Sequence, residues 1–87
     1  MNKFLVISFK SRNELFSFVK FLRENGIIAQ IINTPRIVSH SCGLSAKTNE
    51  FNYSKLVNLL SLTKPYGFLG LFLITRLGLQ EKAERLY

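Results

Sequence analysis

The only cysteine of this 87-residue chain, Cys42, is the residue best suited by type to do chemistry. It stands in the polar segment Ser41-Cys42-Gly43-Leu44. A single cysteine cannot close an intramolecular disulfide, and one Cys with one His supplies too few ligands for a zinc site, so we expect no metal and no cofactor. Two interpretations of Cys42 stay open from the residues alone. Free cysteines often act as small buried hydrophobes, whereas polar flanks favour an exposed, reactive thiol.

Residues close to Cys42 in the sequence have types that could act on a thiolate. Arg36 carries a guanidinium that can bind an anion, and His40 can serve as a base or hydrogen-bond partner, although both would also be ordinary in an exposed loop. Gly43 lacks a Cβ and so lets a backbone N–H or a ligand approach the sulfur. A Cys-His hydrolase is not expected, because no third orienting group or oxyanion pocket is evident.

The pattern of apolar residues predicts six elements that would position this segment. Ser11 and Glu14 have the spacing of a capping box at the start of the first helix, and Gly26 suits its end. The expected order is strand 3–9, helix 12–25, strand 27–32, strand 44–48, helix 53–63 and strand 68–75. The last residues, 79–87, are expected to be a C-terminal tail, either one or two helical turns or frayed.

This β-α-β-β-α-β order predicts a single α+β domain of ferredoxin-like architecture over residues 1–78. Its sheet would have four antiparallel strands in the order 4-1-3-2, with two helices on one face. The topology would bring the loop that carries Cys42 close to the amino terminus of the first helix, beside Lys10 and Arg12. The partial positive charge of a helix amino terminus, together with these cations, would lower the pKa of the thiol below about 8.5.

The charge balance is strongly basic, with twelve Lys and Arg against five Glu and a net charge of +7. This favours anionic partners in general, but the basic residues are scattered, and solvated surface charge is the simpler interpretation. Nucleic-acid binding is not expected, because the aromatic-rich strand motifs of RNA-binding domains are missing. The longest apolar stretch, Tyr66–Leu79, is interrupted by Arg76 and is shorter than the ~20 residues of a membrane span. The unpaired thiol suits the cytoplasm, where we expect the protein.

Three segments taken in order carry a resemblance to a known family. They are Glu24-Asn25-Gly26-Ile27, Thr34-Pro35-Arg36 and Ser41-Cys42-Gly43-Leu44. From Phe4 to Thr75 the chain resembles the small bacterial proteins described as selenium/sulfur carriers. The resemblance implies a ferredoxin-like domain in which Cys42 carries sulfur or selenium, with Pro35, Arg36 and Ser41 as loop signature. Ile37 and His40 depart from the family pattern, which has an acid after Pro-Arg and a serine before Ser-Cys.

The leading hypothesis is a carrier that is not a stand-alone enzyme. Cys42 would hold the chalcogen as a persulfide or selenosulfide, receive it from a donor protein and pass it to an acceptor protein. One alternative is a non-catalytic interaction module that forms a homodimer through Phe16, Phe21 or the last strand and binds a ligand or protein. A thiol redox sensor is the other.

Overall fold

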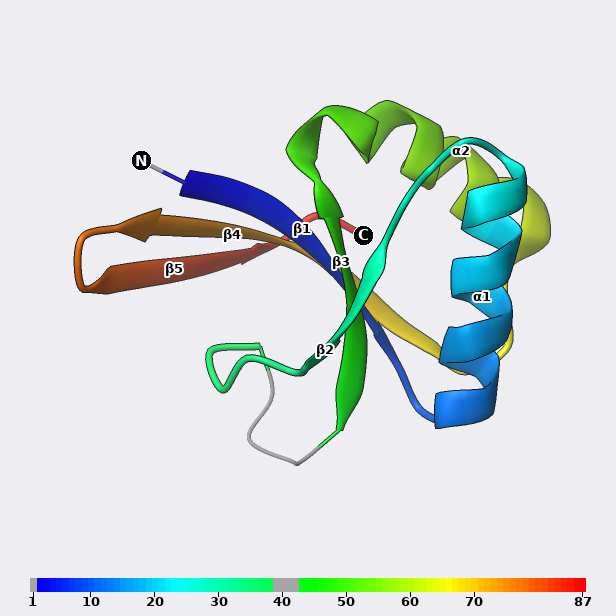
Figure 1. Ribbon diagram of the computed structural model, residues 1–87, viewed down its shortest axis with the longest axis horizontal. Helices are drawn as coiled ribbons and strands as arrows, with labels where there is room; N and C mark the ends of the chain where they lie inside the picture. The colour runs from blue at the N-terminus through cyan, green and yellow to red at the C-terminus, as the bar shows by residue number, and fades with distance from the viewer. Residues whose placement is uncertain (1, 39–42) are drawn as a thin grey trace.

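The computed structural model describes residues 2–38 and 43–87, and this part of the chain forms two α-helices, one short 3₁₀ helix and five strands (Figure 1). All six predicted elements are present, with β2 shorter than expected. The elements are β1 (Asn2–Phe9), α1 (Arg12–Glu24), β2 (Gln30–Asn33), β3 (Leu44–Asn49), η1 (Glu50–Asn52), α2 (Tyr53–Thr63), β4 (Phe68–Leu77) and β5 (Gln80–Arg85).

The strands form one antiparallel sheet in the order β2-β3-β1-β4-β5. The four expected strands occur in the expected order, but the prediction of a four-stranded sheet is wrong. The segment expected to be a helical or frayed tail is β5. A tight turn at Gly78, whose φ is +62°, returns the chain so that Gln80 pairs with Leu77. Glycine suits this turn because residues with a Cβ rarely adopt a positive φ.

The two helices cover one face of the sheet and enclose the main core with it (Figure 1). Alternate residues of β1 point to this side, as the period of two in a strand requires. Helix α1 begins where Ser11 Oγ accepts the backbone N–H of Glu14 at 3.4 Å, half of the predicted capping box. The buried residues of this core are Leu5, Ile7, Phe9, Leu15, Phe18, Val19, Leu22, Ile27, Ala46, Leu56, Leu60 and Leu71.

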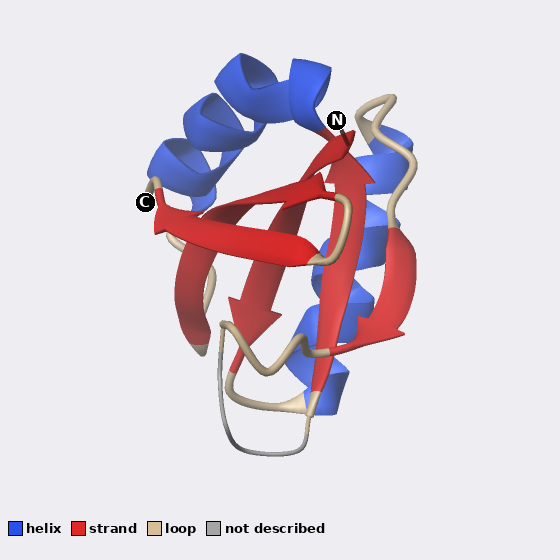
Figure 2. Cartoon of the chain, turned by 90° about the vertical axis from the view of Figure 1, so that its left-hand side faces the viewer, coloured by secondary structure: helices blue, strands red, loops and turns tan. Residues whose placement is uncertain are grey.

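The opposite face of the sheet, called here the helix-free face, has a second and smaller core. Phe4, Val6 and Ile74 are buried there, and Val6 and Ile74 have no exposed surface at all. Figure 2 shows why: the sheet is so strongly twisted that the β4–β5 hairpin crosses in front of β1 and β3. Phe72 and Ala83 of this hairpin pack against the small core. The fifth strand therefore covers a face that a four-stranded sheet would leave more exposed.

The two phenylalanines considered for a dimer surface have different environments. Phe16 is 47% exposed, whereas Phe21 packs against the main core, with its ring centroid 6.0 Å from that of Phe18. The last predicted strand, β4, is paired on both sides and is not an edge. The edge on this side of the sheet is β5, whose charged residues discourage pairing with another sheet, and the other edge is β2.

Candidate functional site

The candidate site is the loop between β2 and β3 that carries Cys42. Cys42, His40 and Ser41 lie outside the described residues, which resume at Gly43. The site is therefore built here from the residues that frame the loop on either side.

The ends of the loop are held together by Thr34 and Gly43. The backbone N–H of Thr34 donates to the carbonyl of Gly43 at 2.9 Å, which continues the β2–β3 ladder by one step. A second hydrogen bond, 2.6 Å long, joins Thr34 Oγ1 to Ser45 Oγ, and Ser45 is fully buried. Gly43 itself has no positive φ, and a Cβ there would lie 3.7 Å from Thr34 Oγ1, an ordinary contact. Gly43 therefore contributes to the base of the loop through its backbone carbonyl, and its lack of a Cβ is not required by the residues described around it.

The first part of the loop folds over the helix-free face. Pro35 begins a turn in which its carbonyl accepts the N–H of Val38 at 2.9 Å. The Val38 side chain then packs against the small core of Phe4, Val6 and Ile74. Arg36 lies in this turn and is exposed to solvent. Figures 1 and 2 both show the segment on the side of the sheet away from α1.

The other predicted cations, Lys10 and Arg12, lie at the start of α1. The register pairs Ser45 with both Ser8 and Ile32, so the ends of β1 and β2 and the start of β3 share one end of the sheet, as the topology predicted. Lys10 and Arg12 are exposed at this end. The structure thus brings these two cations to the end of the sheet where the loop begins. The turn that carries Arg36, however, bends onto the helix-free face of the sheet, which is the face away from α1.

Three further basic side chains, which the sequence did not single out, gather on the helix-free face. Lys47 Nζ lies 4.4 Å from the ring centroid of Phe4, and the guanidinium carbon of Arg76 lies 5.0 Å from it. The guanidinium of Arg85 lies 5.9 Å from the ring of Phe72 and donates to a backbone carbonyl. Arg76 also forms an ion pair with Glu81. The rings of Phe4 and Phe72 belong to the same small core as Val38, so this cationic group and the loop share one face.

Part of this group could have been found from the sequence. Lys47 alternates with Ala46 and Thr48 of a predicted half-exposed strand, and the register places it opposite Val6. Arg85 could not have been found, because its position depends on β5, whose residues carry almost no apolar pattern. The register that pairs Phe72 with Arg85 is visible only in the structure.

The described residues offer neither a metal site nor a membrane span. Over residues 2–38 and 43–87, no three His, Cys, Asp or Glu side chains are grouped as metal ligands. None of the described helices is long and apolar enough to cross a bilayer.

Fold and loop together define a small α+β domain built around a hairpin loop with a single Cys-Gly pair. The chain belongs to the family described as Putative Se/S carrier protein-like, whose model matches residues 4–64. The match begins within β1, includes the whole loop and α2, and ends before β4. No curated protein and no solved structure was found to match the chain.

Proposed function

We propose that the protein is a cytoplasmic carrier that holds sulfur or selenium on Cys42 and transfers it between two proteins. The observation that carries the proposal is the family match over residues 4–64, which includes the Cys-Gly pair. The bonds of Thr34 to Gly43 and Ser45 support it, because they give the loop a fixed base on the sheet. A carrier needs a thiol that two different partners can reach in turn, and a hairpin loop at one end of a small domain suits that need.

The transfer is an exchange at sulfur and needs no external oxidant. The Cys42 thiolate attacks the terminal sulfur of a donor persulfide, R–S–SH. A new S–S bond forms as the donor's S–S bond breaks, and the electron pair leaves on the donor as R–S⁻. The product is Cys42–S–SH, or Cys42–S–SeH when the terminal atom is selenium. A nucleophile of the acceptor then attacks that terminal atom and releases the Cys42 thiolate.

Positive charge near the loop would help both steps. The thiolate and the persulfide anion are favoured by nearby cations, and Lys47, Arg76 and Arg85 share the helix-free face with Val38 of the loop. Lys10 and Arg12 add charge at the end of the sheet where the loop begins. We propose that these groups, with Arg36, stabilise the anion and attract acidic surfaces of donor and acceptor.

Loading by a cysteine desulfurase tests the proposal. The reduced protein is incubated with the desulfurase and cysteine, and intact mass spectrometry follows. The expected result is a gain of one sulfur atom that dithiothreitol removes. Because Cys42 is the only cysteine, Cys42→Ser is a matched control that removes the thiol and little else. No gain in the wild type, or the same gain in Cys42→Ser, would contradict a role as sulfur carrier. A parallel incubation with a selenium donor distinguishes the two elements.

A further inference from the structure

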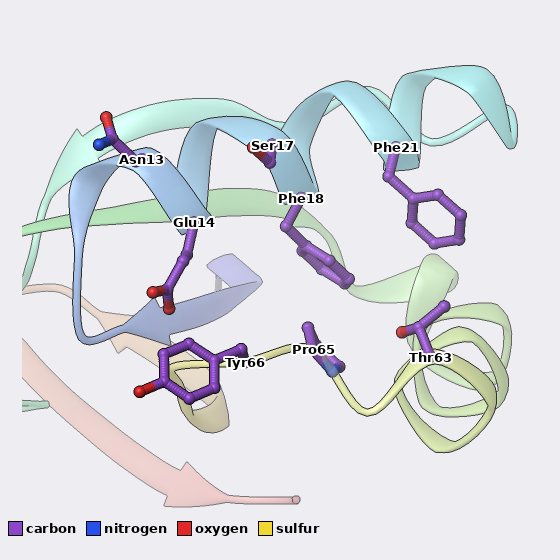
Figure 3. Close-up of a pocket in the computed structure, with 8 residues that line it drawn as sticks. All are labelled: Asn13, Glu14, Ser17, Phe18, Phe21, Thr63, Pro65 and Tyr66. Atoms are coloured by element: carbon purple, nitrogen blue, oxygen red, sulfur yellow. The ribbon is translucent and has the colours of Figure 1, made fainter.

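A cavity lies between α1 and the segment that joins α2 to β4, away from the helix-free face. Its volume is about 360 Å³, and its wall is largely apolar. Phe18 and Phe21 of α1 form one side, and Pro65 and Tyr66 of the connecting segment form the other (Figure 3). Tyr66 is 84% exposed, so its ring stands at the mouth of the cavity and is not part of the core.

The carboxylate of Glu14 lies at one end of this cavity without a partner. Its Oε2 atom is buried and has no hydrogen bond in the described part of the chain. The side chain does not complete the capping box at Ser11. Figure 3 shows it directed toward the ring of Tyr66. A partly buried carboxylate without a donor is costly, so this group favours a partner that the described part of the polypeptide does not supply.

Gly67 makes room for this carboxylate. Its φ is +80°, and a Cβ added there would lie 1.6 Å from Glu14 Oε2. The turn is anchored by the backbone N–H of Lys10, which donates to the carbonyl of Gly67 at 2.7 Å. Among the residues described, Arg76–Glu81 is the ion pair that forms, although the chain has twelve basic residues. None of the described Lys and Arg side chains forms an ion pair with Glu14.

We propose that this cavity binds a small organic amine. The ammonium group donates to the carboxylate of Glu14, which lines the cavity, and lies near the ring of Tyr66, whose face attracts cations. The apolar body of the amine fills the space between Phe18, Phe21 and Pro65. The proposal does not depend on Cys42. Two of the lining residues, Pro65 and Tyr66, lie beyond residues 4–64, so the family match does not cover the whole site.

Titration of the full-length protein with phenethylamine tests the proposal, followed by ¹H–¹⁵N correlation spectra. The expected result is saturable shifts centred on Ser17, Phe21 and Tyr66. 2-Phenylethanol, which has the same body without the charge, should bind at least about five-fold more weakly, since a charge-assisted hydrogen bond is lost. Equal binding of the alcohol, shifts centred elsewhere, or no saturable shift with the amine would overturn the proposal.

Two variants and a matched control identify the residue responsible. Glu14→Gln should weaken phenethylamine binding by at least about five-fold, whereas Glu24→Gln, at an exposed position of the same helix outside the cavity, should not change it. Ser17→Leu, at an exposed helix position on the cavity wall, should narrow the cavity and also weaken binding, so it tests the site even if Glu14→Gln fails to fold. Unchanged affinity in a folded Glu14→Gln, or in Ser17→Leu, would contradict the proposal. Sulfur loading of Cys42 should be unaffected in all three variants.

Discussion

Thr34 and Gly43 close the base of the loop that carries the only cysteine, with the N–H of Thr34 donating to the carbonyl of Gly43 at 2.9 Å. The same threonine bonds through its hydroxyl to Ser45, which is fully buried. One residue therefore ties the loop to the sheet through its backbone and through its side chain. The sequence places Thr34 at the end of a strand, where it looks like an ordinary residue before a proline.

Replacement of Thr34 tests the side-chain half of this closure. Thr34→Val keeps the shape and the backbone bond but leaves the buried hydroxyl of Ser45 without its partner. We expect a loss of about 1–3 kcal/mol in the free energy of unfolding, measured by urea denaturation. Thr34→Ser, which keeps the hydroxyl, should recover most of it. Thr63→Val is the matched control, since its exposed hydroxyl bonds only to the carbonyl of Leu59, and we expect a change within about 0.5 kcal/mol. Equal effects at both threonines would contradict this account.

A comparison of substitutions at Gly67 and Gly78 distinguishes the cost of backbone strain from the cost of a steric clash. Both have a positive φ, +80° and +62°, but a Cβ at Gly78 meets nothing within 4 Å, whereas one at Gly67 overlaps the Glu14 carboxylate. Gly78→Ala should lower the free energy of unfolding by about 1 kcal/mol, and Gly67→Ala by at least about 1 kcal/mol more, since the carboxylate must move.

A double-mutant cycle with Glu14→Ala checks the cause of that difference. Without the carboxylate, Gly67→Ala should cost about as much as Gly78→Ala, because only the strain of the positive φ remains. If Gly67→Ala costs the same with and without Glu14, the conflict with the carboxylate is not what makes the glycine necessary.

The C-terminal residues, expected to be a tail, contribute to the core. Leu86 packs against the main core, and its backbone N–H donates to the carbonyl of Leu71 at 2.7 Å. Leu86→Ala should therefore lower the free energy of unfolding by about 1–2 kcal/mol. Leu79, at the exposed tip of the β4–β5 turn, is the matched control, and Leu79→Ala should change it by less than about 0.5 kcal/mol. If thermal or urea unfolding shows no difference between the two variants, the terminus is not packed as described.

The strands and helices that could be predicted are those with a clear apolar period. The apolar residues of α1 repeat at helical spacing because the helix buries one face, whereas β1 is a continuous apolar run because both of its faces are buried. Strand β5 has one small apolar residue, Ala83, among five polar ones. It pairs because Gly78 turns the chain back onto β4, so its formation depends on a tertiary contact that no local pattern carries.

The same reason limits what the sequence could say of the site. The order of the strands correctly placed Lys10 and Arg12 at the end of the sheet where the loop begins. It could not show that Val38 draws the loop onto the helix-free face, because that contact needs the small core of Phe4, Val6 and Ile74. The β4–β5 hairpin crosses the sheet and helps to cover this core with Phe72 and Ala83, and it also brings Arg85 there (Figure 2).

The cations of the helix-free face should be detectable through the reactivity of Cys42. A thiolate near positive charge is stabilised, so we expect the pKa of the Cys42 thiol to lie below about 8.5, as read from the rate of alkylation by iodoacetamide against pH. Removal of a nearby cation destabilises the thiolate and raises the pKa of the thiol, so Lys47→Gln and Arg85→Gln should slow alkylation at pH 7 by about two-fold each.

Lys20→Gln, on the exposed side of α1, is the matched control and should leave the alkylation rate unchanged. The predicted difference should shrink at high salt, because exposed charges are screened within a Debye length of about 3 Å at 1 M. A thiol pKa at or above 8.5, or equal effects of Lys20 and Lys47, would mean that this cationic face does not activate the cysteine.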